Sequence, residues 1–305
     1  MYPMTLLLMA IGMSTRAAEP PDGQATIRAK AGASEIVITT TARLAGAIHS
    51  LTWNNKEFID SADHGRQLQS ACSFHRGSLK HFWAETYNPT EAGSRKDGAG
   101  DRSSSTLLSL NAVANELKTT TRMAFWLAPG EKSSDRPARN DKILSDHEVS
   151  KRVKIGYRDW PNVIEYEVTF LVPENEKQTF AQFEAVTGYM PAEFSRFWKF
   201  DPQLGELKTL EDGPGEQEFP VVLATPNGSH AMGIFSPDQP SKGFEKAGYG
   251  RFRFGPEKVV KWNCVFRIQN EQGVPAGKHT FRSFVIVGSL KEVSESLAGL
   301  RKAMK

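Results

Sequence analysis

The sequence VIEYEVTFLV at residues 163–172 and the sequence TFAQFEAVT at residues 179–187 decide the fold class. Both are rich in β-branched and aromatic residues, which favour strands. The segment PENE at residues 173–176 lies between them, and its Pro and Asn favour a turn. The middle of the chain is therefore expected to form two strands that flank a turn.

The same strand pattern continues on both sides of these runs. Residues 35–41 (EIVITTT) are rich in β-branched side chains, and residues 45–60 (AGAIHSLTWNNKEFID) predict a hairpin. Its turn is Asn54-Asn55, because asparagine tolerates a positive φ. Further strands are expected at residues 219–224, 231–236, 259–269 and 280–287. Strands recur with almost no helical periodicity, so the sequence predicts an all-β fold, a large antiparallel β-sandwich.

One short helix is expected at the C-terminus. Ser289 and Glu292 have the spacing of a capping box. Apolar residues then follow at helical intervals along one face, at Leu290, Val293, Leu297, Leu300 and Met304. Two polar segments, 87–105 and 129–146, are expected to be loops and are too short to link domains. Residues 19–305 are therefore expected to form a single β-sandwich domain.

The N-terminus resembles a secretory signal peptide. The apolar run at residues 5–13 (TLLLMAIGM) is too short to span a bilayer, and the small residues Thr15 and Ala17 follow it. We expect residues 1–18 to be a signal peptide and the mature protein to be periplasmic or secreted, without further membrane insertion. A positive charge is missing before the apolar run. A buried N-terminal apolar segment is therefore the alternative.

The overall charge and the cysteines exclude several classes of protein. The 305 residues include 38 Lys and Arg against 35 Asp and Glu, a near-balance that argues against nucleic acid as the main partner. Cys72 and Cys264 are too few for a disulfide framework or a four-cysteine zinc site, and two separately buried thiols are expected. His75, His81 and Glu85 lack the helical pattern of zinc hydrolases. No metal and no cofactor are expected.

Residues 63–91 (DHGRQLQSACSFHRGSLKHFWAETYNPTE) concentrate the polar and titratable side chains of the chain. A cleft for a polyhydroxylated ligand needs such a mixture, because each hydroxyl exchanges its hydrogen bonds with water for bonds with the protein. The expected catalytic residues are His64, Glu85 and Glu91. The expected ligand-binding residues in this segment are Arg66, Gln69, Tyr87 and Asn88.

Each candidate residue has a possible chemical role, and some have a purely structural alternative. A histidine side chain can donate or accept a proton, which makes His64 a candidate acid or base, and Glu85 follows the aromatic residues Phe82 and Trp83, which can stack on a sugar. Glu91 lies six residues after Glu85, so the two could act as a carboxylate pair. The alternatives are a solvated loop charge for Glu91 and a buried Asp63–Arg66 ion pair that anchors a loop.

Three features lie outside this segment. Trp198, within EFSRFWKFDP at residues 193–202, is either a sugar platform or a core residue. His230 follows a hairpin signal at residues 226–228 and is either a second imidazole at the rim of the site or simply exposed. The stretch YGRFRFGPEKVVKW at residues 249–262 is basic and aromatic, and we interpret it as a solvated sheet face.

Two passages resemble the galactose mutarotase-like family, the supersandwich proteins that include aldose 1-epimerases. They are the hairpin at residues 45–60 and GVPAGKHTFRSFVIVG at residues 273–288, which is similar to the family's late turn and last long strand. The resemblance implies a supersandwich fold and a carbohydrate ligand. The family's mid-chain histidine motif has no counterpart, and Glu271 stands before the late turn in different surroundings. No catalytic role is carried over to this chain.

The expected function is that of an exported carbohydrate-active protein, which binds a mono- or oligosaccharide in a polar cleft. General acid/base chemistry near an anomeric centre, epimerase-like or glycoside-cleaving, would use Glu85 or Glu91 as base and His64 as acid. One alternative is a polysaccharide lyase acting on uronate-containing glycans, with Tyr87 or His64 as base. The other is a non-catalytic sugar-binding module.

Overall fold

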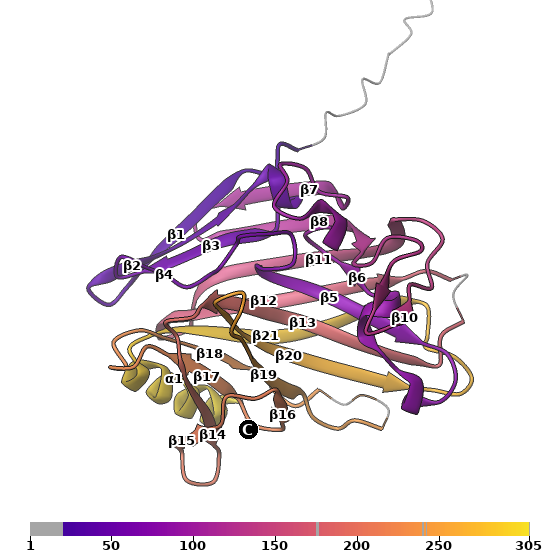
Figure 1. The fold of residues 1–305 in the computed structure, drawn as a ribbon. Helices are drawn as coiled ribbons and strands as arrows, with labels where there is room; N and C mark the ends of the chain where they lie inside the picture. Colours follow the sequence, from indigo (N-terminus) through magenta and orange to yellow (C-terminus); the bar gives the residue numbers. More distant parts are fainter. Residues whose placement is uncertain (1–20, 175–176, 240, 242, 305) are drawn as a thin grey trace, which may run out of the picture.

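The two central runs form β12 (Trp160–Val172) and β13 (Phe180–Pro191) in the computed structural model, which describes residues 21–174, 177–239, 241 and 243–304. The two strands do not pair with each other, because each has its partners in a different layer. β12 and β13 therefore belong to different layers of a sandwich (Figure 1). The expected signal peptide, residues 1–18, lies outside the described residues.

The first layer carries β13 near its centre. Antiparallel pairing gives the order β1, β2, β3, β5, β13, β20, β19, β16. The bounds of these strands are β1 Ala25–Ala31, β2 Ser34–Thr40, β3 Ile48–Trp53, β5 Leu68–His75, β20 Val259–Gln269, β19 Gly248–Phe254 and β16 Gly215–Gln217. Asn54 and Asn55 form the predicted hairpin turn with φ of 48° and 60°, and lead into β4 (Lys56–Glu57).

The second layer carries β12 near its centre, in the order β7, β8, β11, β12, β21, β18, β17, β14, β15. The bounds of these strands are β7 Thr106–Val113, β8 Glu116–Phe125, β11 Leu144–Tyr157, β21 Gly277–Gly288, β18 Ala231–Phe235, β17 Val221–Ala224, β14 Arg196–Asp201 and β15 Glu206–Leu210. The short β6 (Pro89–Thr90) pairs with both β5 and β8 and so joins the two layers at one edge.

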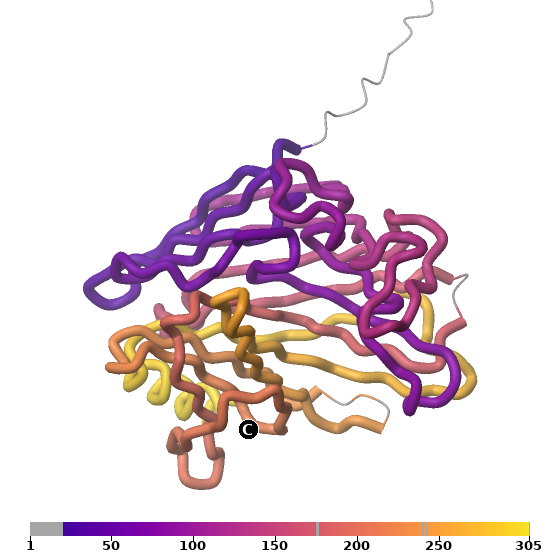
Figure 2. Tube along the Cα trace, in the orientation of Figure 1, coloured from indigo at the N-terminus to yellow at the C-terminus, as the bar shows by residue number. Residues whose placement is uncertain are grey.

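The C-terminal helix α1 (Leu290–Ala303) covers the outer face of the second layer, as the yellow end of the trace in Figure 2 shows. Ser289 and Glu292 form the expected capping box. Val293 and Leu297 are fully buried in one apolar cluster with Phe284 of β21. The prediction of an all-β sandwich with a short C-terminal helix is therefore confirmed. Among the described residues, no helix is both long and apolar enough to cross a membrane.

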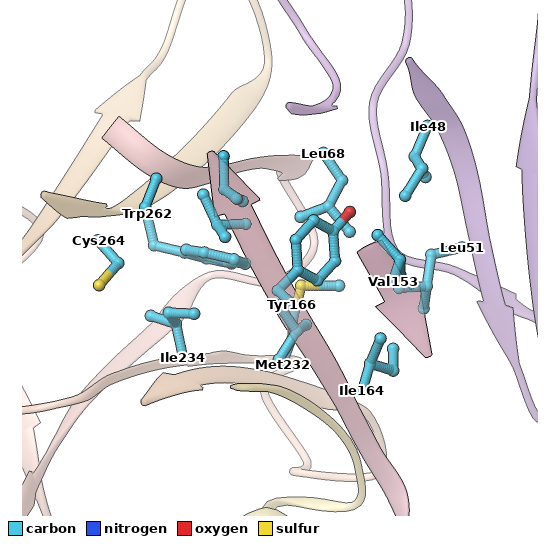
Figure 3. Close-up of a cluster of buried hydrophobic side chains, with 14 of the residues drawn as sticks. Ile48, Leu51, Leu68, Val153, Ile164, Tyr166, Met232, Ile234, Trp262 and Cys264 are labelled. Carbon is cyan, nitrogen blue, oxygen red and sulfur yellow. The ribbon is translucent and has the colours of Figure 1, made fainter. Parts of the chain in front are cut away.

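The main core lies between the two layers and follows the two-residue period of each strand. Trp262 and Cys264 of β20 point into it, and Figure 3 shows the Trp262 ring extending toward Tyr166 of the second layer. Cys72 is buried as well, and neither cysteine forms a disulfide, as expected. The intervening residues of β20 face the outside of the first layer. That outer face is where the candidate site lies.

Candidate functional site

A hollow of about 440 Å³ lies on the outer face of the first layer, over β5, β13, β20 and β19. We refer to it as the outer hollow. Its volume is within the range of small-molecule sites in proteins. The floor of the outer hollow consists of strand residues, and one wall consists of loop residues near Glu85 and Trp126.

The strand register determines which side chains form the floor. Residues directly opposite each other in antiparallel strands point to the same face of the sheet. Gln69 of β5, Thr187 of β13, Asn263 of β20 and Gly250 of β19 are paired in this way, and Glu216 of β16 is opposite Gly250. The side chains of this row therefore face one surface. Gly250 has no side chain to obstruct Asn263, whose Oδ1 accepts a hydrogen bond from the Gly250 amide at 3.0 Å.

A second row of the floor is aromatic. Phe252 and Phe254 have ring centroids 6.1 Å apart and an interplanar angle of 9°, and the Tyr189 ring lies 6.4 Å from Phe254 at 18°. The Lys261 ammonium lies 5.0 Å from the Tyr189 ring and 5.4 Å from the Phe252 ring, a cation–π arrangement. We call Tyr189, Phe252 and Phe254 the aromatic ledge. All three aromatic side chains line the outer hollow.

Two carboxylates on the floor are neutralised by cations. Glu184 lies 3.2 Å from the Lys261 ammonium, and Glu216 accepts two bonds from the Arg267 guanidinium at 2.7 and 2.6 Å. Burial alone would lower the pKa of Lys261, but Glu184 and Tyr189 outweigh it and raise this pKa. Burial raises the pKa of Tyr189. At neutral pH the floor therefore presents an ammonium group and a neutral phenol.

A bulge in β13 brings additional polar side chains to the floor. The register shifts between Glu184 and Val186 against β20, and between Glu184 and Thr187 against β5. Ala185 and Val186 are both fully buried in the core, so the regular alternation is interrupted. As a result Glu184 and Thr187, three residues apart, both line the outer hollow.

The loop wall opposite the ledge contains the predicted residues Glu85 and Asn88. Glu85 lies in η3 (Ala84–Tyr87), and its carboxylate accepts a hydrogen bond from the Ser133 hydroxyl. Asn88 Nδ2 donates to the Cys72 carbonyl at 2.7 Å. On the floor, Gln69 Nε2 donates to the Gly65 carbonyl at 2.9 Å. Thus Gln69, Glu85 and Asn88, three of the residues predicted from the sequence, all line the outer hollow.

His64 does not reach the outer hollow, and the expectation that it provides an acid there is corrected. It is 1% exposed. Its Nδ1 lies 2.8 Å from the Gly98 carbonyl oxygen, and its Nε2 lies 2.8 Å from the Arg43 carbonyl oxygen. Both ring nitrogens are thus occupied by backbone groups of two loops. His64 holds these loops together and has no nitrogen left for a ligand.

Glu91 is also corrected, because it is fully buried between the layers. Its Oε1 lies 2.5 Å from the Lys151 ammonium, and its Oε2 accepts a bond from the Ser70 amide at 3.0 Å. Both side chains of the ion pair are at most 1% exposed. Neither the catalytic role nor the solvated loop charge expected from the sequence fits this position.

Arg66 and Tyr87 lie beside the outer hollow without lining it. The Arg66 guanidinium pairs with Asp63 at 3.1 Å and with Asp60 at 3.7 Å, the structural role weighed from the sequence. The Tyr87 ring packs against Phe125, and Tyr87 lines a different hollow of about 420 Å³. Neither side chain lines the outer hollow, and the expectation that Arg66 and Tyr87 bind a ligand stays a prediction.

Trp198 and His230 lie elsewhere in the fold. Trp198 of β14 packs against the apolar cluster under α1, so its position is that of a core residue. His230 has its ring 5.7 Å from Trp53 and its Nδ1 2.9 Å from the Ser229 hydroxyl. Neither residue lines the outer hollow, and the binding roles expected for both stay predictions.

Several residues of the outer hollow were missed from the sequence. Glu184, Tyr189, Lys261 and Asn263 belong to long strands and lie far from residues 63–91. A signal was present in residues 249–262, where Phe252 and Phe254 alternate with arginines, but we interpreted that stretch as a solvated face. Among the described residues, no three His, Cys, Asp or Glu side chains are grouped as a metal site requires.

No family model and no curated protein matches this sequence. Among solved structures, the chain is similar to the Slr1438 protein from Synechocystis, with 8% identity over 90% of this chain and 100% of that one and a TM-score of 0.45. A Klebsiella pneumoniae protein proposed to be an aldose 1-epimerase has 8% identity over 89% and 84% of the two chains, with a TM-score of 0.43.

The alpha-galactosidase from Lactobacillus brevis has 9% identity and a TM-score of 0.48 over 92% of this chain, which spans only 42% of that enzyme. The resemblance is one of fold alone. All three TM-scores are below 0.5, and these similarities assign no residue of this chain a role.

Proposed function

We propose that the protein binds a mono- or oligosaccharide in the outer hollow. The observation that carries this proposal is the convergence of the aromatic ledge with carboxylate and amide side chains on one concave surface. A sugar ring has an apolar face that stacks on aromatic rings, and hydroxyl groups that require donors and acceptors. Glu184, Glu216 and Asn263 supply acceptor oxygens beside the ledge. Lys261 supplies a donor.

We also propose Glu85 as the group that performs general acid/base chemistry near an anomeric centre. The other two carboxylates, Glu184 and Glu216, are held in ion pairs. Among the described residues Glu85 is paired with no cation, and its hydrogen-bond partner is the hydroxyl of Ser133. A carboxyl group without a fixed counter-ion is suited to exchange a proton with a ligand hydroxyl. Epimerase-like and glycoside-cleaving reactions both use such a group.

Non-catalytic sugar binding is the second candidate function. It is supported by the state of the carboxylates that line the outer hollow. Glu184 and Glu216 are neutralised by cations, so among the described residues Glu85 is the single carboxylate of the hollow that is left without a counter-ion. The lyase scheme expected from the sequence used Tyr87 or His64 as base. Neither side chain lines the outer hollow, so neither is placed to act as the base on a ligand bound there.

The binding test is a glycan array followed by titration calorimetry of the best ligand. Trp83 and Phe254 are 37% and 36% exposed and line the outer hollow, so we expect Trp83→Ala and Phe254→Ala to weaken binding about tenfold each. Leu204→Ala is the matched control, since Leu204 is 59% exposed and lies outside the outer hollow. Equal loss in all three variants, or no binding by the wild type, contradicts the proposal.

The catalytic test compares Glu85→Gln with the wild type on the bound saccharide, by NMR of anomeric signals and by assay of new reducing ends. We expect the variant to bind but to form no product. A Glu85→Gln variant with full activity removes Glu85 from the scheme, and a wild type that binds without turnover favours the non-catalytic module.

We propose, finally, that residues 1–18 direct export and that the mature protein is periplasmic or secreted. The apolar run at residues 5–13 and the small residues after it support this. N-terminal sequencing of the protein recovered from fractionated cells is the test. A protein recovered from the cytoplasm with an intact N-terminus contradicts export.

A further inference from the structure

A small hairpin within the segment expected to be a loop, residues 129–146, holds the loop wall of the outer hollow. Its strands are β9 (Lys132–Ser133) and β10 (Arg136–Pro137). Ser134 and Asp135 form the turn with φ of 45° and 61°. The Arg139 amide, just after the hairpin, donates to the Thr86 carbonyl at 2.9 Å and so attaches this segment to η3.

Ser133 connects two residues of the outer hollow. The Trp83 indole Nε1 lies 3.0 Å from the Ser133 hydroxyl oxygen, and the same hydroxyl bonds to Glu85 Oε2. An indole N–H is only a donor, so the Ser133 oxygen accepts from Trp83. Its single hydrogen is then left for Glu85. The two bonds therefore run in one direction, from the indole through the hydroxyl to the carboxylate.

Arg136 of the same hairpin restrains the Trp83 ring. Its guanidinium lies 5.1 Å from the ring centroid, and Nη1 donates to the Phe82 carbonyl at 3.2 Å. The hairpin thus holds both the N–H edge of the indole and its ring, yet Trp83 stays 37% exposed. An exposed tryptophan restrained in this way is preorganised, which lowers the entropy lost when a ligand stacks on it.

We propose that Ser133 is a positioning residue of the outer hollow, which sets the Trp83 ring and the Glu85 carboxylate in fixed relative orientation. This inference rests on the proposed function of the outer hollow as a saccharide site. Because Oε2 of Glu85 is held by Ser133, Oε1 is the oxygen that meets the ligand. The ligand therefore encounters a stacking surface and a carboxylate oxygen whose separation is set by one hydroxyl.

The test compares Ser133→Thr with Ser133→Val, two side chains of the same shape that differ in the hydroxyl group. Calorimetry with the saccharide found on the array measures affinity, and ¹⁵N NMR follows the Trp83 indole N–H, assigned with Trp83→Phe. We expect Ser133→Thr to bind like the wild type, and Ser133→Val to bind about tenfold more weakly with a shifted indole resonance. Lys132→Ala, an exposed change on the same hairpin, is the control and should have no effect.

The outcomes separate this inference from the function on which it rests. A wild type that binds no saccharide overturns the proposed function and this inference with it. A wild type that binds, together with equal affinities for the Thr and Val variants, overturns only the positioning role of Ser133. Comparing the melting temperatures of the two variants excludes a folding defect as the cause of a difference, because their shapes match.

Discussion

The buried ion pair between Glu91 and Lys151 leads to a quantitative prediction about stability. The two groups are 2.5 Å apart and at most 1% exposed, and Glu91 also accepts the Ser70 amide. Replacing Lys151 by Met leaves the Glu91 carboxylate buried without its counter-ion. Removing one partner of such a pair costs about 3–5 kcal/mol in free energy of unfolding. For a chain of 305 residues that corresponds to a melting temperature lower by roughly 5–8 °C.

Urea unfolding followed by circular dichroism measures this cost. We expect Lys151→Met and Glu91→Gln each to lose several kcal/mol, and the double variant to lose much less than the sum, because no charge then remains buried alone. The exposed pair Lys142–Asp146, 2.6 Å apart, is the control, and Lys142→Met should cost about 1 kcal/mol or less. A Lys151→Met variant as stable as the Lys142→Met control, or strictly additive costs, refutes the reasoning.

Three further predictions concern other parts of the fold. Burial lowers the pKa of His147 from 6.5 to about 3, so between these pH values the unfolded state binds a proton that the folded state excludes. The free energy of unfolding should therefore fall with falling pH, by at most about 1.4 kcal/mol per pH unit, and His147→Phe should flatten denaturation curves measured across this window. Gly250→Ala places a methyl group against Asn263, so calorimetry should show weakened saccharide binding whereas Gly255→Ala, which meets open space, should not. Leu297→Ala leaves a cavity under α1 and should cost about 2–5 kcal/mol by urea unfolding; a loss below 1 kcal/mol would mean that the helix is dispensable.

The strands and the helix were largely predictable, because their signals are local. The β-branched runs became β12 and β13, the Asn54-Asn55 turn adopted positive φ, and the Ser289 capping box began α1. The segment of residues 63–91 also contributed Gln69, Glu85 and Asn88 to the outer hollow. For the strands, the turn and the helix, the deciding interactions lie within a few residues along the chain.

The roles of His64 and Glu91 were not predictable, because composition does not show what covers a side chain. Both occur in a polar stretch, yet His64 is enclosed by backbone carbonyls at Arg43 and Gly98, and Glu91 by Lys151 from another layer. Their partners are 21 to 60 residues away in the sequence, as the positions 43, 98 and 151 show. Whether a titratable side chain is buried or accessible therefore depends on how distant segments of the chain pack around it.

The sequence by itself determined an all-β sandwich with one terminal helix, since the period of hydrophobic residues depends only on neighbouring positions. The outer hollow was decided by the tertiary structure. Its floor depends on a row of paired residues across five strands, Gln69, Thr187, Asn263, Gly250 and Glu216, and on the bulge beside Glu184. A shift of one residue in any of these registers would turn the side chains to the other face of the sheet. Register is set by contacts between distant strands, which no local pattern specifies.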